Sequence, residues 1–177
     1  MKKYIKSIIK NIFFYFLRPE NKEISKLIDN FNTDLNILDI GATGGIQNKW
    51  KLIKNVLNVT LVEPNVTDEL KENSFKTLNI IRKIFYSKPN KTQKLFITKY
   101  HLCSSLYKPN YSYLSKFKGK TDFFSLDSFE IVKEIDLETT TVDSSFEKKT
   151  LDFIKIDAEG SHLDILEGSS KKLDEIL

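Results

Sequence analysis

An acidic residue directly before a glycine-rich turn is the first feature of this sequence that could do chemistry. Residues 39–45 read Asp-Ile-Gly-Ala-Thr-Gly-Gly and end a short apolar stretch, 35–40. Glycines allow a tight turn and a close approach of the backbone, so N–H groups at a helix start can hold an anionic group. The Asp39 carboxylate does not help to bind a phosphate. A ligand with both an ammonium and a carboxylate, by contrast, can pair its ammonium with Asp39. Taken alone, the motif is equally compatible with a structural turn.

A second acid ends the next apolar stretch. Glu63 closes the strand-like run 59–63 and lies 24 residues after Asp39. In a strand-helix-strand unit, a carboxylate about 20 residues after the glycine turn accepts hydrogen bonds from ribose hydroxyls. Together the two features predict a nucleoside cofactor with an amino-acid end, as in S-adenosyl-L-methionine. A nicotinamide cofactor is the weaker alternative, because the loop reads G-x-x-G-G and not G-x-G-x-x-G.

A third acidic strand end lies near the C-terminus. The buried-strand pattern 151–157 contains Phe-Ile-Lys-Ile and ends in Asp157, and Glu159 follows. Charged residues directly after a buried strand usually have a specific role. One alternative is that they cap the next helix. Ligands bind beyond the carboxyl ends of parallel strands, where these acids would meet the glycine turn. We therefore favour the interpretation that Asp157 and Glu159 belong to a functional site.

Four segments, in order, resemble the FkbM-type family of class I S-adenosylmethionine-dependent methyltransferases. The most specific is 151–168, which is similar to the family's D-F-I-K-I-D-x-E-G signature. The others are 39–45, 62–65 and 103–110, and the last is similar to an S-S-L-x-x-P stretch of one family branch. The resemblance covers about residues 37–169.

This resemblance implies roles for individual residues. Those that would bind S-adenosyl-L-methionine are Asp39, Gly41, Ala42, Gly44, Glu63 and Asp157. Asp157 and Glu159 would face the transferable methyl group, and Asp157, or secondly His162, would take the proton of the acceptor. A plain surface role for His162 stays open. Ser104 and Ser105 would line the acceptor pocket, and no metal ion is expected.

The implied reaction is methylation of a hydroxyl group on a small molecule or glycan. The alternative is a truncated, non-catalytic module of the same fold that acts by binding a partner. One departure from the family concerns adenine, because residues 86–88 read Tyr-Ser-Lys and offer no acid after the third strand. The lone Cys103 has no obvious basic partner and is not expected to be a nucleophile.

The elements that must position these residues alternate between helical and strand-like patterns. Helical spacing occurs at 24–31, 47–57, 66–76, 161–167 and 171–177, and strand patterns at 35–40, 59–63, within 78–86 and at 151–157. Extra strands at 95–98 and 129–142 predict an inserted β-hairpin region. The prediction is an α/β, Rossmann-like class I methyltransferase sheet with helices on both faces. Since that class has seven strands, we expect residues 21–177 to be a partial domain without its C-terminal strands.

The N-terminal segment is basic and amphipathic. Its first eighteen residues hold five basic and no acidic side chains, which accounts for the net charge of +4. Apolar residues at intervals of three and four predict a helix over 1–20. Its unbroken apolar run is too short to span a bilayer. Residues 1–18 could contact an anionic membrane surface or pack on the domain. Because the basic residues are confined to this segment, no nucleic-acid partner is expected. The expected location is the cytoplasm, including the inner face of a bacterial membrane.

Overall fold

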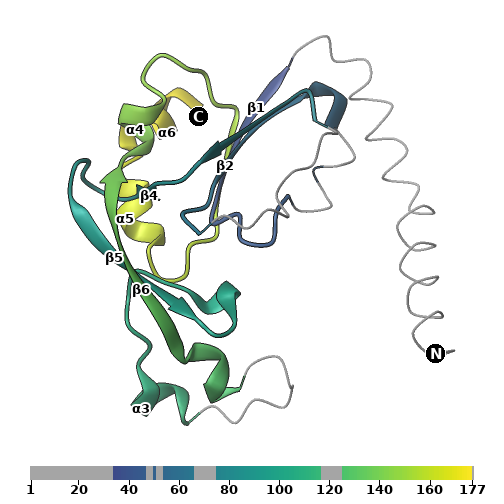
Figure 1. Ribbon diagram of the computed structural model, residues 1–177. Coiled ribbons are helices and arrows are strands. Elements are labelled where there is room, and N and C mark those ends of the chain that lie inside the picture. Colours follow the sequence, from purple (N-terminus) through teal and green to yellow (C-terminus); the bar gives the residue numbers. More distant parts are fainter. Residues whose placement is uncertain (1–33, 47–49, 51–53, 66–74, 117–124, 177) are drawn as a thin grey trace, which may run out of the picture.

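The computed structural model describes residues 34–46, 50, 54–65, 75–116 and 125–176 (Figure 1). The helices expected at 1–20 and 24–31 lie outside the described residues, as do most of those expected at 47–57 and 66–76. The membrane contact proposed for residues 1–18 therefore stays a prediction. Among the described helices, none has the length and apolar character needed to cross a membrane.

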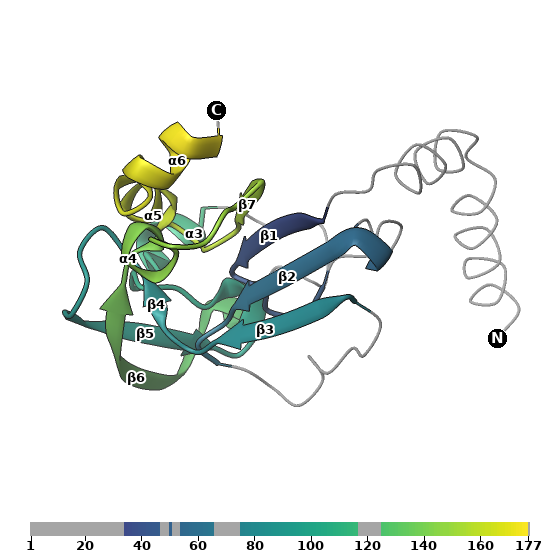
Figure 2. The same cartoon turned by 90° about the horizontal axis from the view of Figure 1, so that it is seen from above.

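Four parallel strands form the first sheet, in the order β3-β2-β1-β7. These strands are β1 (Leu35–Ile40), β2 (Leu57–Val62), β3 (Thr77–Ile81) and β7 (Phe153–Ile156). Figure 2 shows them side by side, with β1 between β2 and β7. The carboxyl ends of β1, β2 and β7 consequently share one edge, as the sequence predicts. The arrangement confirms the Rossmann-like α/β expectation.

Apolar side chains cover both faces of this sheet. On one face, Leu38, Ile40 and Val62 pack with residues of three short helices, namely α4 (Val142–Ser145), α5 (His162–Glu167) and α6 (Ser170–Ile176). On the other face, Leu57, Val59 and Leu61 pack with Trp50 and Phe75. The described helices α4 to α6 thus gather on one side (Figure 2). The helices expected on the other face lie largely outside the described residues.

A second sheet has the order β4-β6-β5. It consists of β4 (Ile84–Phe85), β5 (Thr92–Thr98) and β6 (Ile131–Thr140). Strands β5 and β6 are antiparallel, which confirms the inserted hairpin, and β4 pairs with β6 in parallel. Short helices flank it at η3 (His101–Cys103), α3 (Tyr111–Leu114) and η4 (Leu126–Phe129).

The third strand expected within 78–86 is β3, which begins one residue earlier, and the same stretch also contains β4. The chain leaves the parallel sheet after Ile81 and enters the second sheet at Ile84. Ile84 packs with Leu95 and Ile97 of β5 in a core cluster of its own. Because those partners belong to the second sheet, burial of Ile84 requires the chain to change sheets. Strand β2 also begins at Leu57, two residues earlier than expected.

We predict that Leu38→Ala lowers the free energy of unfolding by about 2–5 kcal/mol, because it leaves a cavity in the centre of β1. Leu38 is completely buried, whereas Leu163 on α5 is 69% exposed. The matched control Leu163→Ala should change stability by less than about 0.5 kcal/mol. Urea titration followed by circular dichroism measures both. Equal effects of the two substitutions would contradict the assignment of the core.

Candidate active site

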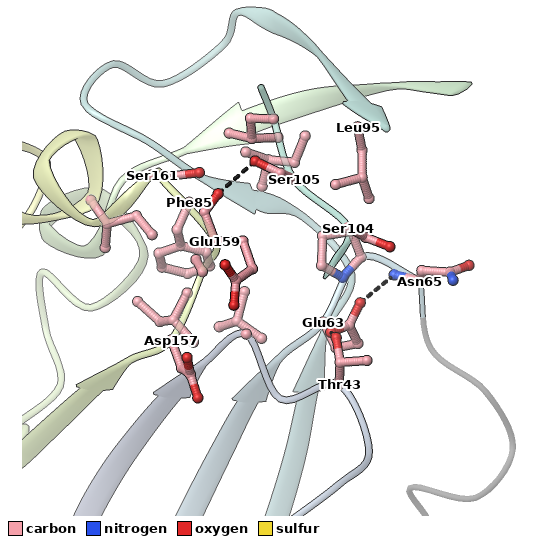
Figure 3. A pocket seen from close by; sticks show the side chains of 18 of the residues that line it. Thr43, Glu63, Asn65, Phe85, Leu95, Ser104, Ser105, Asp157, Glu159 and Ser161 are labelled. Atoms are coloured by element: carbon pink, nitrogen blue, oxygen red, sulfur yellow. Dashed lines mark hydrogen bonds between the residues drawn. The ribbon is translucent and has the colours of Figure 1, made fainter. Parts of the chain in front are cut away.

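A cavity of about 290 Å³ lies at the carboxyl ends of β1, β2 and β7. The second sheet and the segment 101–106 close it from the other side (Figure 3). The sequence-predicted residues that line it are Gly41, Glu63, Ser104, Ser105, Asp157 and Glu159. Asp39, Ala42, Gly44 and His162 are not part of the lining. The cavity therefore unites residues from three predicted motifs and the loop after β5.

Gly41 allows the ends of β1 and β7 to approach closely. Its φ is +78°, and a Cβ built there would lie 2.0 Å from the carbonyl oxygen of Asp157. The N–H groups of Gly41 and Ala42 both donate to the carbonyl oxygen of Val62, at 3.0 and 3.2 Å. These two amides of the glycine turn are thus in use inside the protein. At Gly44, by contrast, a Cβ would meet nothing within 4 Å.

Glu63 is held in place by two hydrogen bonds. Its Oε1 accepts from the Asn65 N–H at 2.8 Å, and its Oε2 accepts from the hydroxyl of Thr43 (Figure 3). Each carboxylate oxygen keeps a second lone pair that can accept from a ligand hydroxyl. The carboxylate is therefore oriented and still able to bind a diol. Sequence analysis missed Thr43, although it stands within the glycine turn.

A buried ion pair connects the two central strands next to the cavity. Asp39 is fully buried, and its Oδ1 lies 2.8 Å from Nζ of Lys155. The two residues are direct partners in the register of β1 and β7. Nζ of Lys155 also lies 3.4 Å from Oδ2 of Asp157, and Lys155 lines the cavity. Sequence analysis assigned no role to Lys155, though a charge inside a short apolar strand was a usable signal.

The loop after β7 carries two carboxylates and is held by backbone and side-chain hydrogen bonds. Its backbone is anchored by the Asp157 N–H, which donates to the carbonyl of Ile40 at 2.9 Å. The hydroxyl of Ser105 donates to the carbonyl of Glu159 at 2.5 Å. Figure 3 shows the side chains of Asp157 and Glu159 at the same cavity as Glu63. The site thus collects three carboxylates around one space.

Tyr107, in the segment between β5 and α3, adds a further contact to this loop. Its ring would lie 3.1 Å from a Cβ at Gly160, and its hydroxyl donates to Oδ2 of Asp164 at 2.6 Å. That hydrogen bond raises the pKa of Tyr107 well above its usual range. The phenol therefore stays protonated and remains a donor to α5. Sequence analysis did not single out Tyr107.

The remaining predicted residues have simpler environments. Ser104 accepts through its hydroxyl from the Thr98 N–H at 3.1 Å, so both predicted serines help to hold their own segment. His162 is exposed at the first residue of α5, outside the cavity lining. Burial raises the pKa of the Cys103 thiol, and the expectation that it is no nucleophile stays a prediction. Within the described part of the chain, no group of His, Cys, Asp and Glu side chains could hold a metal ion.

Comparison with protein families assigns the chain to a class. The family described as the methyltransferase FkbM domain matches residues 39–177. The protein therefore belongs to this family of methyltransferases, and the resemblance noted in the sequence is confirmed. Neither the comparison with curated proteins nor that with solved structures gives a significant match.

We predict that Lys155→Met lowers the free energy of unfolding by about 3–5 kcal/mol, because it removes one partner of a buried ion pair. The double variant D39N/K155M should recover most of this loss, since it removes both charges. Thermal unfolding of the three proteins measures the difference. A single variant as stable as the parent would show that the ion pair does not hold the strands.

Proposed function

We propose that this protein transfers the methyl group of S-adenosyl-L-methionine to a hydroxyl group of a small molecule or glycan. The observation that carries the proposal is the shared cavity of Gly41, Glu63 and Asp157 at the carboxyl ends of three parallel strands. Membership of a methyltransferase family supports the class of reaction. The cofactor and the acceptor are the parts that need testing.

The residues present fit the parts of such a cofactor. The oriented carboxylate of Glu63 can accept hydrogen bonds from both ribose hydroxyls. Apolar side chains of Ile84 and Ile97, which line the same cavity, can contact a flat ring such as adenine. Because Gly41 has no Cβ, its backbone can lie directly against the Asp157 carbonyl at the bottom of the cavity, where β1 and β7 meet. When bound, the cofactor supplies an electrophilic methyl group on a positively charged sulfur.

The chain's own contribution is alignment of the acceptor and removal of its proton. Asp157 is the proposed base, because its side chain is 57% exposed and the residue lines the cavity. Lys155 restricts where this carboxylate can lie. Glu159 adds a second carboxylate at the same edge, where negative charge favours a cationic ligand. Holding the acceptor oxygen in line with the methyl group supplies the larger share of the acceleration. His162, outside the cavity lining, has no part in this proposal.

We expect Glu63→Gln to weaken binding of S-adenosylhomocysteine by roughly tenfold or more, since hydrogen bonds to a charged group are lost. Isothermal titration calorimetry of the 177-residue chain measures the affinity. The matched control is Glu147→Gln, because Glu147 is exposed and outside the cavity lining. Absence of binding by folded parent protein would refute the cofactor proposal and favour a non-catalytic module that binds a partner.

Asp157→Asn should lower the rate of methyl transfer by about 10²–10⁴-fold at saturating cofactor, because it removes the proposed base. The assay follows labelled methyl groups from S-adenosyl-L-methionine into a panel of monosaccharides, nucleotide sugars and polyols. Asp174→Asn on the exposed side of α6 serves as the matched control and should leave the rate unchanged. Equal rates for the Asp157 variant and its control would exclude Asp157 as the base.

A further inference from the structure

One hydroxyl group at the cavity is not used within the protein. Among the described residues, four hydroxyl side chains line the cavity, namely those of Thr43, Ser104, Ser105 and Ser161. The first three each take part in a hydrogen bond to another part of the chain. The hydroxyl of Ser161, by contrast, makes no hydrogen bond to any residue that the structure describes. Ser161 is therefore the member of this set that is free to bind a ligand.

Ser161 is almost completely buried, which makes a free hydroxyl at this position unusual. The residue is only 3% exposed and lines the cavity, and Figure 3 shows its oxygen directed into that space. Buried polar groups nearly always have a hydrogen-bond partner, because a group that lacks one destabilises the folded protein. A molecule that enters the cavity can supply this partner.

A tight turn after β7 brings Ser161 back to the cavity wall. The Ser161 N–H donates to the carbonyl of Ala158 at 2.8 Å, and Gly160 has a φ of +84°. A positive φ at the third of four residues is typical of a type II turn. A serine directly before a helix usually caps it through its hydroxyl, but Ser161 makes no such bond to α5. Ile165, one helical turn later, is also buried and lines the same cavity.

The position of Ser161 favours the methyl acceptor over the cofactor as its ligand. Glu63, the proposed ribose ligand, follows β2, whereas Asp157 and Ser161 both follow β7, and β1 lies between these strands. Figure 3 shows Glu159 between Ser161 and Glu63. An acceptor whose reacting hydroxyl lies at the proposed base Asp157 can therefore reach Ser161 with a neighbouring group. A serine hydroxyl donates one hydrogen bond and accepts others, so it suits a second hydroxyl group.

We propose that Ser161 binds a second hydroxyl group of the methyl acceptor, next to the hydroxyl that is methylated. The acceptor is accordingly a polyol or a sugar ring and not an alcohol with a single oxygen. This inference rests on the proposed function and adds the substrate class to it. Ser161 acts in binding and orienting the acceptor, while removal of the proton stays with Asp157.

The test compares Ser161→Ala with the matched control Ser125→Ala. Ser125 also precedes a short helix, η4, without a side-chain cap, but it is exposed and outside the cavity lining. The acceptor probes are the methyl glycosides of glucose, galactose, mannose and rhamnose, the monodeoxy analogues of each, and cyclohexanol. Kinetics at saturating S-adenosyl-L-methionine give KM and kcat for each probe. Calorimetry gives the affinity for S-adenosylhomocysteine, and thermal unfolding shows whether each variant is folded.

Ser161→Ala should raise the KM of an accepted glycoside by about three- to tenfold, with kcat and the affinity for S-adenosylhomocysteine changed less than about twofold. The parent protein should show a similar loss on the analogue that lacks the second hydroxyl. On that analogue, Ser161→Ala should add no further loss, because the partner of Ser161 is already missing. The unfolding temperature of Ser161→Ala should stay within about 2 °C of the parent, since no internal hydrogen bond is lost. Ser125→Ala should behave as the parent throughout.

Several results would overturn the inference while leaving the proposed function standing. These are an unchanged KM in Ser161→Ala, an equal loss on the glycoside and all its deoxy analogues, and weaker binding of S-adenosylhomocysteine. Efficient methylation of cyclohexanol, or of none of the glycosides, by parent protein that binds S-adenosylhomocysteine would equally reject a polyol acceptor. Failure of the folded parent protein to bind S-adenosylhomocysteine would refute the proposed function itself.

Discussion

The buried ion pair between Asp39 and Lys155 joins two strands that lie far apart in the sequence and sets their register. A slip of one residue would place the Asp39 carboxylate opposite Ile154 or Ile156 and not opposite Lys155. A buried pair is costly to desolvate, and its best-supported benefit is that it selects one arrangement over its neighbours. Here the selected arrangement brings Gly41 against Asp157, so the geometry of the whole site depends on it.

The two sheets contribute different halves of the cavity. The parallel sheet supplies Glu63, Lys155 and Asp157, which are charged groups at strand ends. The second sheet supplies an apolar wall, to which Leu95 and Ile97 belong. Hydrogen bonds from Ser105 to the Glu159 carbonyl and from Tyr107 to Asp164 join the halves. In the proposed reaction, the acceptor hydroxyl lies near the charged half and the rest of the acceptor lies against the apolar half.

Much of the parallel sheet was predictable because β1, β2 and β7 are short apolar runs that are followed by an acid or a glycine. The position of Glu63 at the end of a strand was predictable for the same reason. The division of residues 77–85 between two sheets was not predictable, since Ile81 and Ile84 are the same residue type and only their packing partners differ. Likewise, Ser104 and Ser105 were recognised as residues near the cavity, but their use in holding backbone groups was not.

The sequence by itself determined which residues stand at strand ends, because hydrophobic runs and glycine turns are local properties of the chain. It thereby determined the fold class, the family and six of the residues that line the cavity. Only the tertiary structure decided which charges meet. Asp39 and Lys155 lie in separate motifs, and their pairing arises when β7 takes its place beside β1. Charge pairing depends on distances of a few ångströms across strands, and no local pattern in the sequence encodes those distances.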